Sequence, residues 1–219
     1  MRTLVFLGTV RDSSPPSPPR LGLRVATACT RFFAESYKDH SVEMIDPLDF
    51  DLGAVFKPHF SYAAGKAPAP LDALAQAIKE ADAYIMVSPE YNHSMSPALA
   101  HLLNHFGSSL YAYKPSAIVS YSAGQWGGVR AAVAMRTLLS ELGCLPVSAM
   151  VHVPKAHQVF NEDGTLATDE SEARWNRYLG RAFTQLVWWA TAAQAHRAIS
   201  NPHALIEDFK RDPSQRNAP

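Results

Sequence analysis

Short apolar runs alternate with helix-periodic segments through most of the chain. The apolar runs predict buried strands at 3–7, 42–45, 83–87, 116–121 and 145–153. Apolar residues spaced three and four apart predict helices that begin at Leu21, Leu71, Pro97 and Val129, and a long helix over 171–197. The apolar positions of the fourth helix are Val129, Val133, Leu138, Leu139 and Leu142. Ser96 before Pro97 is typical of a helix start, because the serine side chain caps a first-turn amide, and Gly107 is expected just past the end of this helix.

This alternation predicts a parallel sheet that is covered by helices on both faces. With right-handed crossovers, the simplest arrangement is a flavodoxin-like three-layer α/β/α sandwich with a five-stranded parallel sheet in the order 2-1-3-4-5. We expect residues 1–197 to form this domain and 198–219 to form a loose C-terminal tail. The segment 47–70, rich in Pro, Gly and Asp, is expected to be a long surface loop.

Charge and cysteine usage narrow the class of protein. The 20 basic and 20 acidic residues cancel, so the basic excess of a nucleic-acid binder is missing. No run of 18 apolar residues occurs, so we expect no membrane span. Cys29 and Cys144 belong to no C-x-x-C pair, which favours two reduced thiols and a cytoplasmic location. The charged fraction of 18% is below the usual ~25% and hints at a surface covered by a partner subunit.

The loop after the first strand is a candidate phosphate site. It contains Thr9 and Arg11, and Arg20 opens the following helix, whose N-terminus offers unpaired amides and a positive dipole end. An ordinary strand-to-helix turn with exposed arginines would have the same residues. The proline-dense stretch 13–19 between the arginines predicts an extended loop. The pattern is neither a Walker motif nor G-x-G-x-x-G.

Two further loops follow the third and fourth predicted strands. In 88–94, Tyr91 offers a ring for stacking and Asn92 both donates and accepts hydrogen bonds. In 122–128, small residues allow close backbone approach, and Trp126 offers a cover. A satisfied turn and a glycine-rich turn with a core tryptophan are the structural alternatives. Since the ends of parallel strands meet at one edge, we expect the three loops to converge on a flat bound cofactor.

Other chemistry is weakly supported. His101 and His105 stand four apart, but no third ligand is evident, so we predict no metal site and place both on a polar face or interface. Glu90 is expected to have a structural role. The pair Trp188 and Trp189 is expected in the core or at a subunit contact.

The three loops resemble those of the NADPH-dependent FMN reductase family, flavodoxin-like flavoproteins that include quinone, azo-dye and chromate reductases. The resemblance implies that Arg11 and the Arg20 region hold the FMN phosphate, that 89–93 line the ribityl chain and one side of the ring, and that 122–128 contact its pyrimidine edge. The residues expected to bind FMN are Thr9, Arg11, Arg20, Leu21, Gly22, Pro89, Glu90, Tyr91, Asn92, His93, Ser122, Ala123, Gly124, Gln125, Trp126, Gly127 and Gly128.

The resemblance also implies an activity: two-electron transfer from NADPH or NADH to a quinone or similar small acceptor, with free flavin, azo dyes and metal oxyanions as further candidates. The flavin would carry the chemistry, so no catalytic side chain is expected. The family implies a homodimer or homotetramer. Two alternatives stay open: a flavodoxin-like one-electron carrier, and an FMN-binding regulatory protein without turnover.

Overall fold

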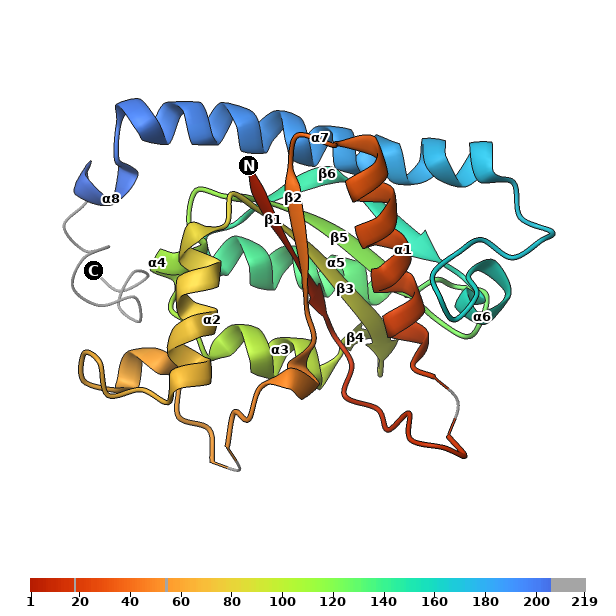
Figure 1. Cartoon of the computed structure of the whole chain (residues 1–219), viewed down its shortest axis with the longest axis horizontal. Helices are drawn as coiled ribbons and strands as arrows, with labels where there is room; N and C mark the ends of the chain where they lie inside the picture. Colours follow the sequence, from red (N-terminus) through yellow and green to blue (C-terminus); the bar gives the residue numbers. More distant parts are fainter. Residues whose placement is uncertain (18, 54, 206–219) are drawn as a thin grey trace.

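A parallel sheet forms the centre of the molecule, in the order β2-β1-β3-β5-β6 (Figure 1). The computed structural model describes residues 1–17, 19–53 and 55–205. Its strands are β1 (Arg2–Leu7), β2 (Ser41–Ile45), β3 (Ala83–Tyr91), β4 (Ser94–Met95), β5 (Pro115–Tyr121) and β6 (Leu145–Val153). The two-residue β4 pairs antiparallel with the end of β3 and lies off this path. The five parallel strands therefore have the predicted 2-1-3-4-5 order of a flavodoxin-like sheet.

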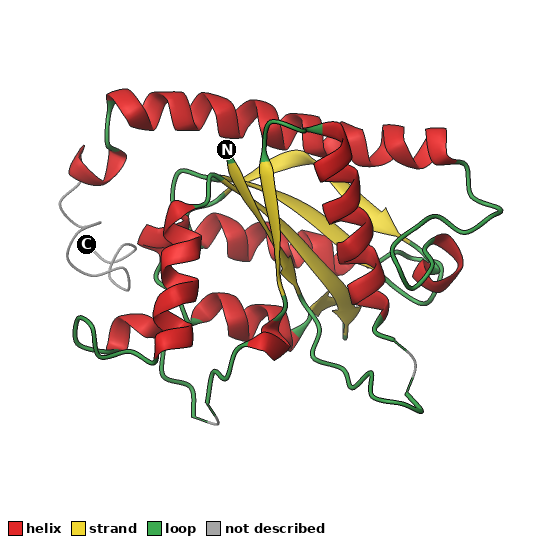
Figure 2. Cartoon of the chain, viewed as in Figure 1, coloured by secondary structure: helices red, strands yellow, loops and turns green. Residues whose placement is uncertain are grey.

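Helices cover both faces of the sheet (Figure 2). One face packs against α1, α6 and α7, and the other against α2, α3, α4 and α5. Their bounds are α1 (Leu21–Ser36), α2 (Ala69–Glu80), α3 (Pro97–Asn104), α4 (Ser108–Tyr111), α5 (Val129–Glu141), α6 (Ala156–Val159), α7 (Glu172–Ile199) and α8 (Pro202–Leu205).

Strand β3 shows why its apolar run is continuous rather than alternating. Ala83, Ile85 and Val87 face the layer of α1 and α7. Tyr84 and Met86 face the opposite helical layer. All five side chains are buried, because a central parallel strand has a helical layer on each side.

Short elements account for most differences from the expected pattern. The segment 47–70 is not a plain loop, since it contains the 3-10 turns η1 (Pro47–Asp49) and η2 (His59–Ser61) and the start of α2. The helices α4, α6 and α8 and strand β4 have two to four residues, too few for periodicity to reveal. Ser96 caps α3 as predicted, accepting from the Leu99 amide at 3.1 Å, but Gly107 precedes α4 rather than closing α3.

Three apolar side chains on the helices lie outside the core. Val133 on α5 is 62% exposed, because Ala131, Ala132 and Met135 form the face that packs on the sheet. Trp188 and Trp189 on α7 are also exposed, so the core alternative for this pair is excluded.

The C-terminal part of the chain continues as helix beyond residue 197. Helix α7 ends at Ile199, and α8 follows with Pro202 buried and the His203 ring 5.8 Å from that of Tyr113. The rest of the predicted tail, 206–219, lies outside the described residues. No helix in the described part of the chain is long and apolar enough to cross a membrane. Cys29 and Cys144 are both buried and free of disulfides.

Candidate functional site: a cleft at the carboxyl edge of the sheet

The three predicted loops meet at one edge of the sheet. Strand register places Leu7 beside Val87 and Pro89 beside Tyr121. The Gly8 amide donates to the Val87 carbonyl at 2.7 Å, which ties the first loop to β3. A cleft of about 560 Å³ opens there, a size typical of small-molecule sites. It is lined by Thr9, Arg11, Asp12, Ser17, Pro19, Arg20, Leu21, Arg24, Pro89, Glu90, Tyr91, Tyr121, Ser122, Ala123 and His157.

The first turn of α1 presents backbone N–H donors to this cleft. The amides of Leu21 and Gly22 donate no hydrogen bond to any residue that the structure describes, and no side chain caps this helix. A Cβ atom at residue 22 would stand 2.4 Å from the Tyr121 hydroxyl, so the close packing here requires glycine. Unpaired amides at the positive end of a 16-residue helix suit a phosphate.

The two arginines of the first loop differ in their partners. Arg11 is exposed, and its side chain has no hydrogen bond or ion pair within the described ranges. Arg20 is 8% exposed, and its guanidinium pairs with the Asp46 carboxylate and donates to the Thr9 carbonyl at 2.9 Å. The charge of Arg20 is therefore balanced inside the protein, whereas that of Arg11 is available to a ligand.

The second loop is a tight hairpin that only partly enters the cleft. Asn92 and His93 have φ values of 50° and 64°, as the two central residues of a type I′ turn require, and both are exposed outside the cleft. Pro89, Glu90 and Tyr91 line the cleft itself.

Glu90 fastens this hairpin to α5. Its carboxylate accepts from the Arg130 amide at 3.1 Å and pairs with the Arg130 guanidinium at 2.6 Å. Burial raises the pKa of Glu90, but the hydrogen bonds from Arg130 and the Ala131 amide outweigh it, and the net pKa is lowered. The contacts agree with the structural role expected for this carboxylate.

Only some residues of the third loop line the cleft, and others shape the turn itself. Ser122 and Ala123 line the cleft. Gly127 and Gly128 are buried with positive φ, and a Cβ at either would crowd β5 or β6, so these glycines shape the turn. Gly124, Gln125 and Trp126 are exposed and do not line the cleft. Trp126 is 61% exposed, which excludes a core role for its ring.

Several cleft residues are not among those expected from the sequence. Tyr121, the last residue of β5, is 4% exposed, and burial raises the pKa of its hydroxyl, so it remains a neutral hydrogen-bonding group. Arg24 lies one helical turn after Arg20, a spacing that signals a shared face. His157 comes from the four-residue α6, which no periodicity reveals. The remaining ones are Asp12, Ser17 and Pro19.

The histidine pair on α3 needs a correction. His105 is fully buried rather than on a polar face, because the Phe56 ring covers it at 4.8 Å. Burial lowers the pKa of this imidazole. Within residues 1–17, 19–53 and 55–205, no three histidine, cysteine or acidic side chains are grouped so as to hold a metal ion.

The model of the family described as NADPH-dependent FMN reductase matches residues 1–158, which include every residue that lines the cleft. The chain belongs to this family. An NAD(P)H-dependent FMN reductase of Pseudomonas aeruginosa is 32% identical over 114 residues, which cover 50% of this chain and 61% of that protein. An NADPH azoreductase of a Bacillus species is 30% identical over 92 residues, 42% of this chain and 50% of the azoreductase.

The matched segments thus span about half to three fifths of the length of these relatives. Among solved structures, the flavoenzyme NAD(P)H:(acceptor) oxidoreductase FerB of Paracoccus denitrificans superposes with a TM-score of 0.64 at 17% identity. That superposition covers 87% of this chain and 97% of FerB. At that identity the likeness establishes the shared fold.

Proposed function

We propose that this family member is an FMN-dependent oxidoreductase that moves two electrons from NADPH or NADH to a quinone or similar small acceptor. The acceptors named for its relatives, a flavin and azo compounds, are further candidates. The observation that carries this proposal is the cleft. There, the N-terminus of α1 and the side chain of Arg11, both without partners among the described residues, lie beside the second and third loops and the ring of Tyr91.

The residues of the cleft fit FMN in two parts. The amides of Leu21 and Gly22 and the guanidinium of Arg11 would hold the phosphate, since they are donors without partners among the described residues. Arg20 would act differently from Arg11: its pairing with Asp46 and Thr9 shapes the loop around that phosphate.

The second and third loops would hold the rest of the cofactor. Pro89 and Tyr91 would flank the ribityl chain and ring, and Ser122 and Ala123 would meet the pyrimidine edge. The amides of Ala123 and Gly124 donate to no described residue and would stabilise negative charge there. Asn92, His93, Gln125 and Trp126 would border the site from outside, while Gly127 and Gly128 would support the turn.

Bound FMN would supply the hydride and electron chemistry, and the chain would supply placement and electrostatics. The Glu90–Arg130 pair would hold Tyr91 at the edge of the cleft. Tyr91 is 38% exposed, so one side of the site stays open for donor and acceptor to enter in turn. We therefore expect ping-pong kinetics.

We further infer that the protein works in the cytoplasm as a homodimer or homotetramer. The two buried, unlinked cysteines support a reducing compartment. The exposed Trp126, Val133, Trp188 and Trp189 offer apolar surface for a second copy. Sedimentation of the purified protein tests the assembly, and a monomer at micromolar concentration would contradict it.

An absorbance spectrum and FMN titration of the purified full chain test the proposed function, followed by anaerobic single-turnover reduction with NADPH and with NADH. We expect a yellow FMN complex that one of these donors reduces directly and that a quinone reoxidises. Protein that ignores FMN would refute the cofactor. An FMN complex that no nicotinamide reduces would instead favour the one-electron carrier or the regulatory protein.

A further inference from the structure

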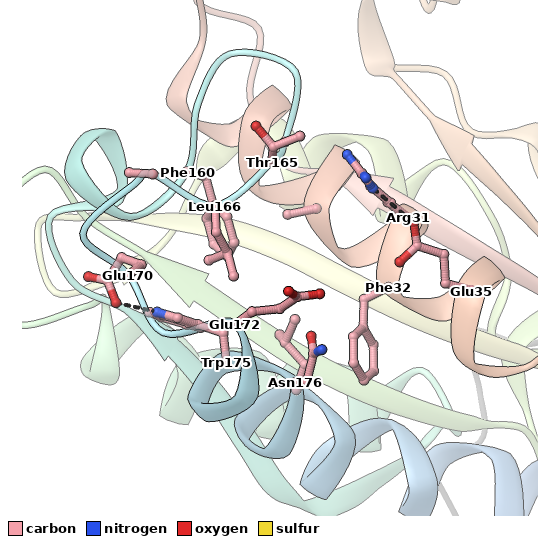
Figure 3. Close-up of a pocket in the computed structure, with 14 residues that line it drawn as sticks. Arg31, Phe32, Glu35, Phe160, Thr165, Leu166, Glu170, Glu172, Trp175 and Asn176 are labelled. Atoms are coloured by element: carbon pink, nitrogen blue, oxygen red, sulfur yellow. Dashed lines mark hydrogen bonds and ion pairs between the residues drawn. The ribbon is translucent and has the colours of Figure 1, made fainter.

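A second cavity, which shares no lining residue with the cleft, lies between α1, the loop 160–170 and the start of α7 (Figure 3). Its volume is about 350 Å³, within the range of small-molecule sites. It is lined by Ala28, Arg31, Phe32, Glu35, Phe160, Gly164, Thr165, Leu166, Ala167, Glu170, Glu172, Trp175, Asn176 and Leu179. Most of these residues follow residue 158, beyond the segment that the family model matches.

The loop 160–170, which forms one wall of this cavity, is preorganised by its own contacts. Gly164, with φ of 77°, lies so close to α1 that a Cβ atom there would stand 2.8 Å from the Ala28 nitrogen. The Asn161 amide donates to the Thr165 carbonyl at 2.8 Å, and Phe160 and Leu166 form an isolated antiparallel bridge. A wall fixed in this way loses little conformational entropy when a ligand binds.

The inner surface is apolar and aromatic. Figure 3 shows Phe32 on one side and Trp175 and Leu166 on the other. The Trp175 ring is held by the hydrogen bond from its Nε1 to Glu170 Oε2 at 2.7 Å and by the Phe160 ring at 5.3 Å. The three aromatic residues that line the cavity, Phe32, Phe160 and Trp175, suit a ligand with a flat or aliphatic apolar part, and aromatic faces also attract cations.

The rim leaves an excess of negative charge. Arg31 is matched by Glu35, with their Nε and Oε1 atoms 2.9 Å apart. Glu172 has no hydrogen bond and no ion pair to any residue in the described part of the chain, and Figure 3 shows its side chain extending into the space between Trp175 and Phe32. The hydrogen bond to Glu35 raises the pKa of Arg31, and the charge of Glu172 helps to raise it through space. Three glutamates, Glu35, Glu170 and Glu172, nevertheless line the cavity against this one arginine. An excess of carboxylates beside aromatic rings favours a cationic ligand over an anionic one.

We propose that this cavity is a second ligand site that takes a small organic cation, a protonated amine on an apolar or aromatic body. The ammonium group lies at the Glu172 carboxylate, and the apolar part of the ligand packs against the aromatic side chains that line the cavity. The site is separate from the cleft, so binding there does not require FMN.

Titration of the 15N-labelled full chain tests this site. The probes are 2-phenylethylammonium, its neutral analogue 2-phenylethanol and the anion 3-phenylpropanoate. The indole N–H signal of Trp175, identified with Trp175→Phe, reports occupancy. We expect the cation to shift this signal with a Kd at least about tenfold below that of the alcohol, and the anion to bind weakest.

Glu172→Gln tests the charge, and Asp39→Asn, at an exposed position away from the cavity, is the matched control. We expect Glu172→Gln to remove the preference for the cation over the alcohol while Asp39→Asn keeps it. Equal affinity of the three probes, a cation that leaves the Trp175 signal unmoved at about 10 mM, or an undiminished preference in Glu172→Gln would each overturn the proposal. None of these readouts depends on turnover, so they stand apart from the tests of the proposed function.

Discussion

At the amino edge of the sheet, the buried charged side chains of Lys114 and Asp82 have partners within the chain, whereas at the carboxyl edge two helix amides and an arginine have none among the described residues. The Lys114 ammonium donates to the carbonyls of Ile78, Lys79 and Leu110 at 2.7, 2.8 and 2.9 Å. At the other end of the same strands, the amides of Leu21 and Gly22 donate to nothing that the structure describes.

The charged groups follow the same division. Asp82 accepts from the Arg2 amide and pairs with Arg197 at 2.7 Å, which links β3 to α7 at the amino edge. Arg11 at the carboxyl edge is exposed and unpaired among the described residues. The contrast supports the proposal that the carboxyl edge binds the ligand, while these charged groups at the amino edge stabilise the fold.

Asp82→Ala should give the largest effect, on stability alone. Removing this carboxylate leaves the partly buried Arg197 without its partner, and we expect a loss of about 3–4 kcal/mol in the free energy of unfolding. FMN affinity should not change, because Asp82 is at the opposite edge. Urea unfolding measures the stability and an FMN titration measures the affinity. The control is Glu43→Gln, which removes one partner of an exposed ion pair and should cost under ~1 kcal/mol. Weaker FMN binding by folded Asp82→Ala would contradict the claim that the amino edge affects stability and not cofactor binding.

Lys114 should make stability depend on pH. Burial, assisted by the charge of Arg197, lowers the pKa of Lys114 from 10.5 to about 7. Between these values the unfolded chain holds a proton that the folded chain has lost, so stability rises with pH across this window. The advantage of the wild type over Lys114→Met should grow by roughly 2–3 kcal/mol from pH 7 to 9.5. Urea unfolding at both pH values measures it, and an unchanged difference would show that the carbonyls keep Lys114 charged.

Arg11→Gln should cause the smallest change in free energy of the three, and this change should affect FMN binding alone. Loss of a charge-assisted hydrogen bond to phosphate costs about 1.5–3 kcal/mol, so we expect FMN to bind roughly ten- to a hundredfold more weakly. Stability should stay within about 0.5 kcal/mol, because Arg11 is exposed. Arg177→Gln, at an exposed position of α7, is the matched control in the same fluorescence titration. Equal affinity in both variants would show that Arg11 does not reach the phosphate.

Local signals in the sequence predicted much of the fold. The strand order follows from five apolar runs and the handedness of their crossovers, and the Ser96 cap follows from two adjacent residues, Ser96 and Pro97. Val133 was misplaced because periodicity does not reveal that small alanines pack closest to the sheet.

The candidate site was predicted less completely, because it depends on contacts between distant residues. The convergence of the three loops follows from sheet topology and is confirmed. The pairing of Arg20 with Asp46 joins residues 26 apart and has no local signature, so the difference between the two arginines is visible only in the structure. The same holds for Tyr121, whose hydroxyl lies against Gly22.

Hydrogen–deuterium exchange with and without FMN tests most directly whether the carboxyl edge is the binding edge. We predict that FMN slows amide exchange in peptides that contain 8–24, 88–93 and 121–126. Peptides at the amino edge, 78–82 and 110–116, should change little beyond any uniform gain in stability. Protection confined to the amino edge, or to the loop 160–170, would contradict the account.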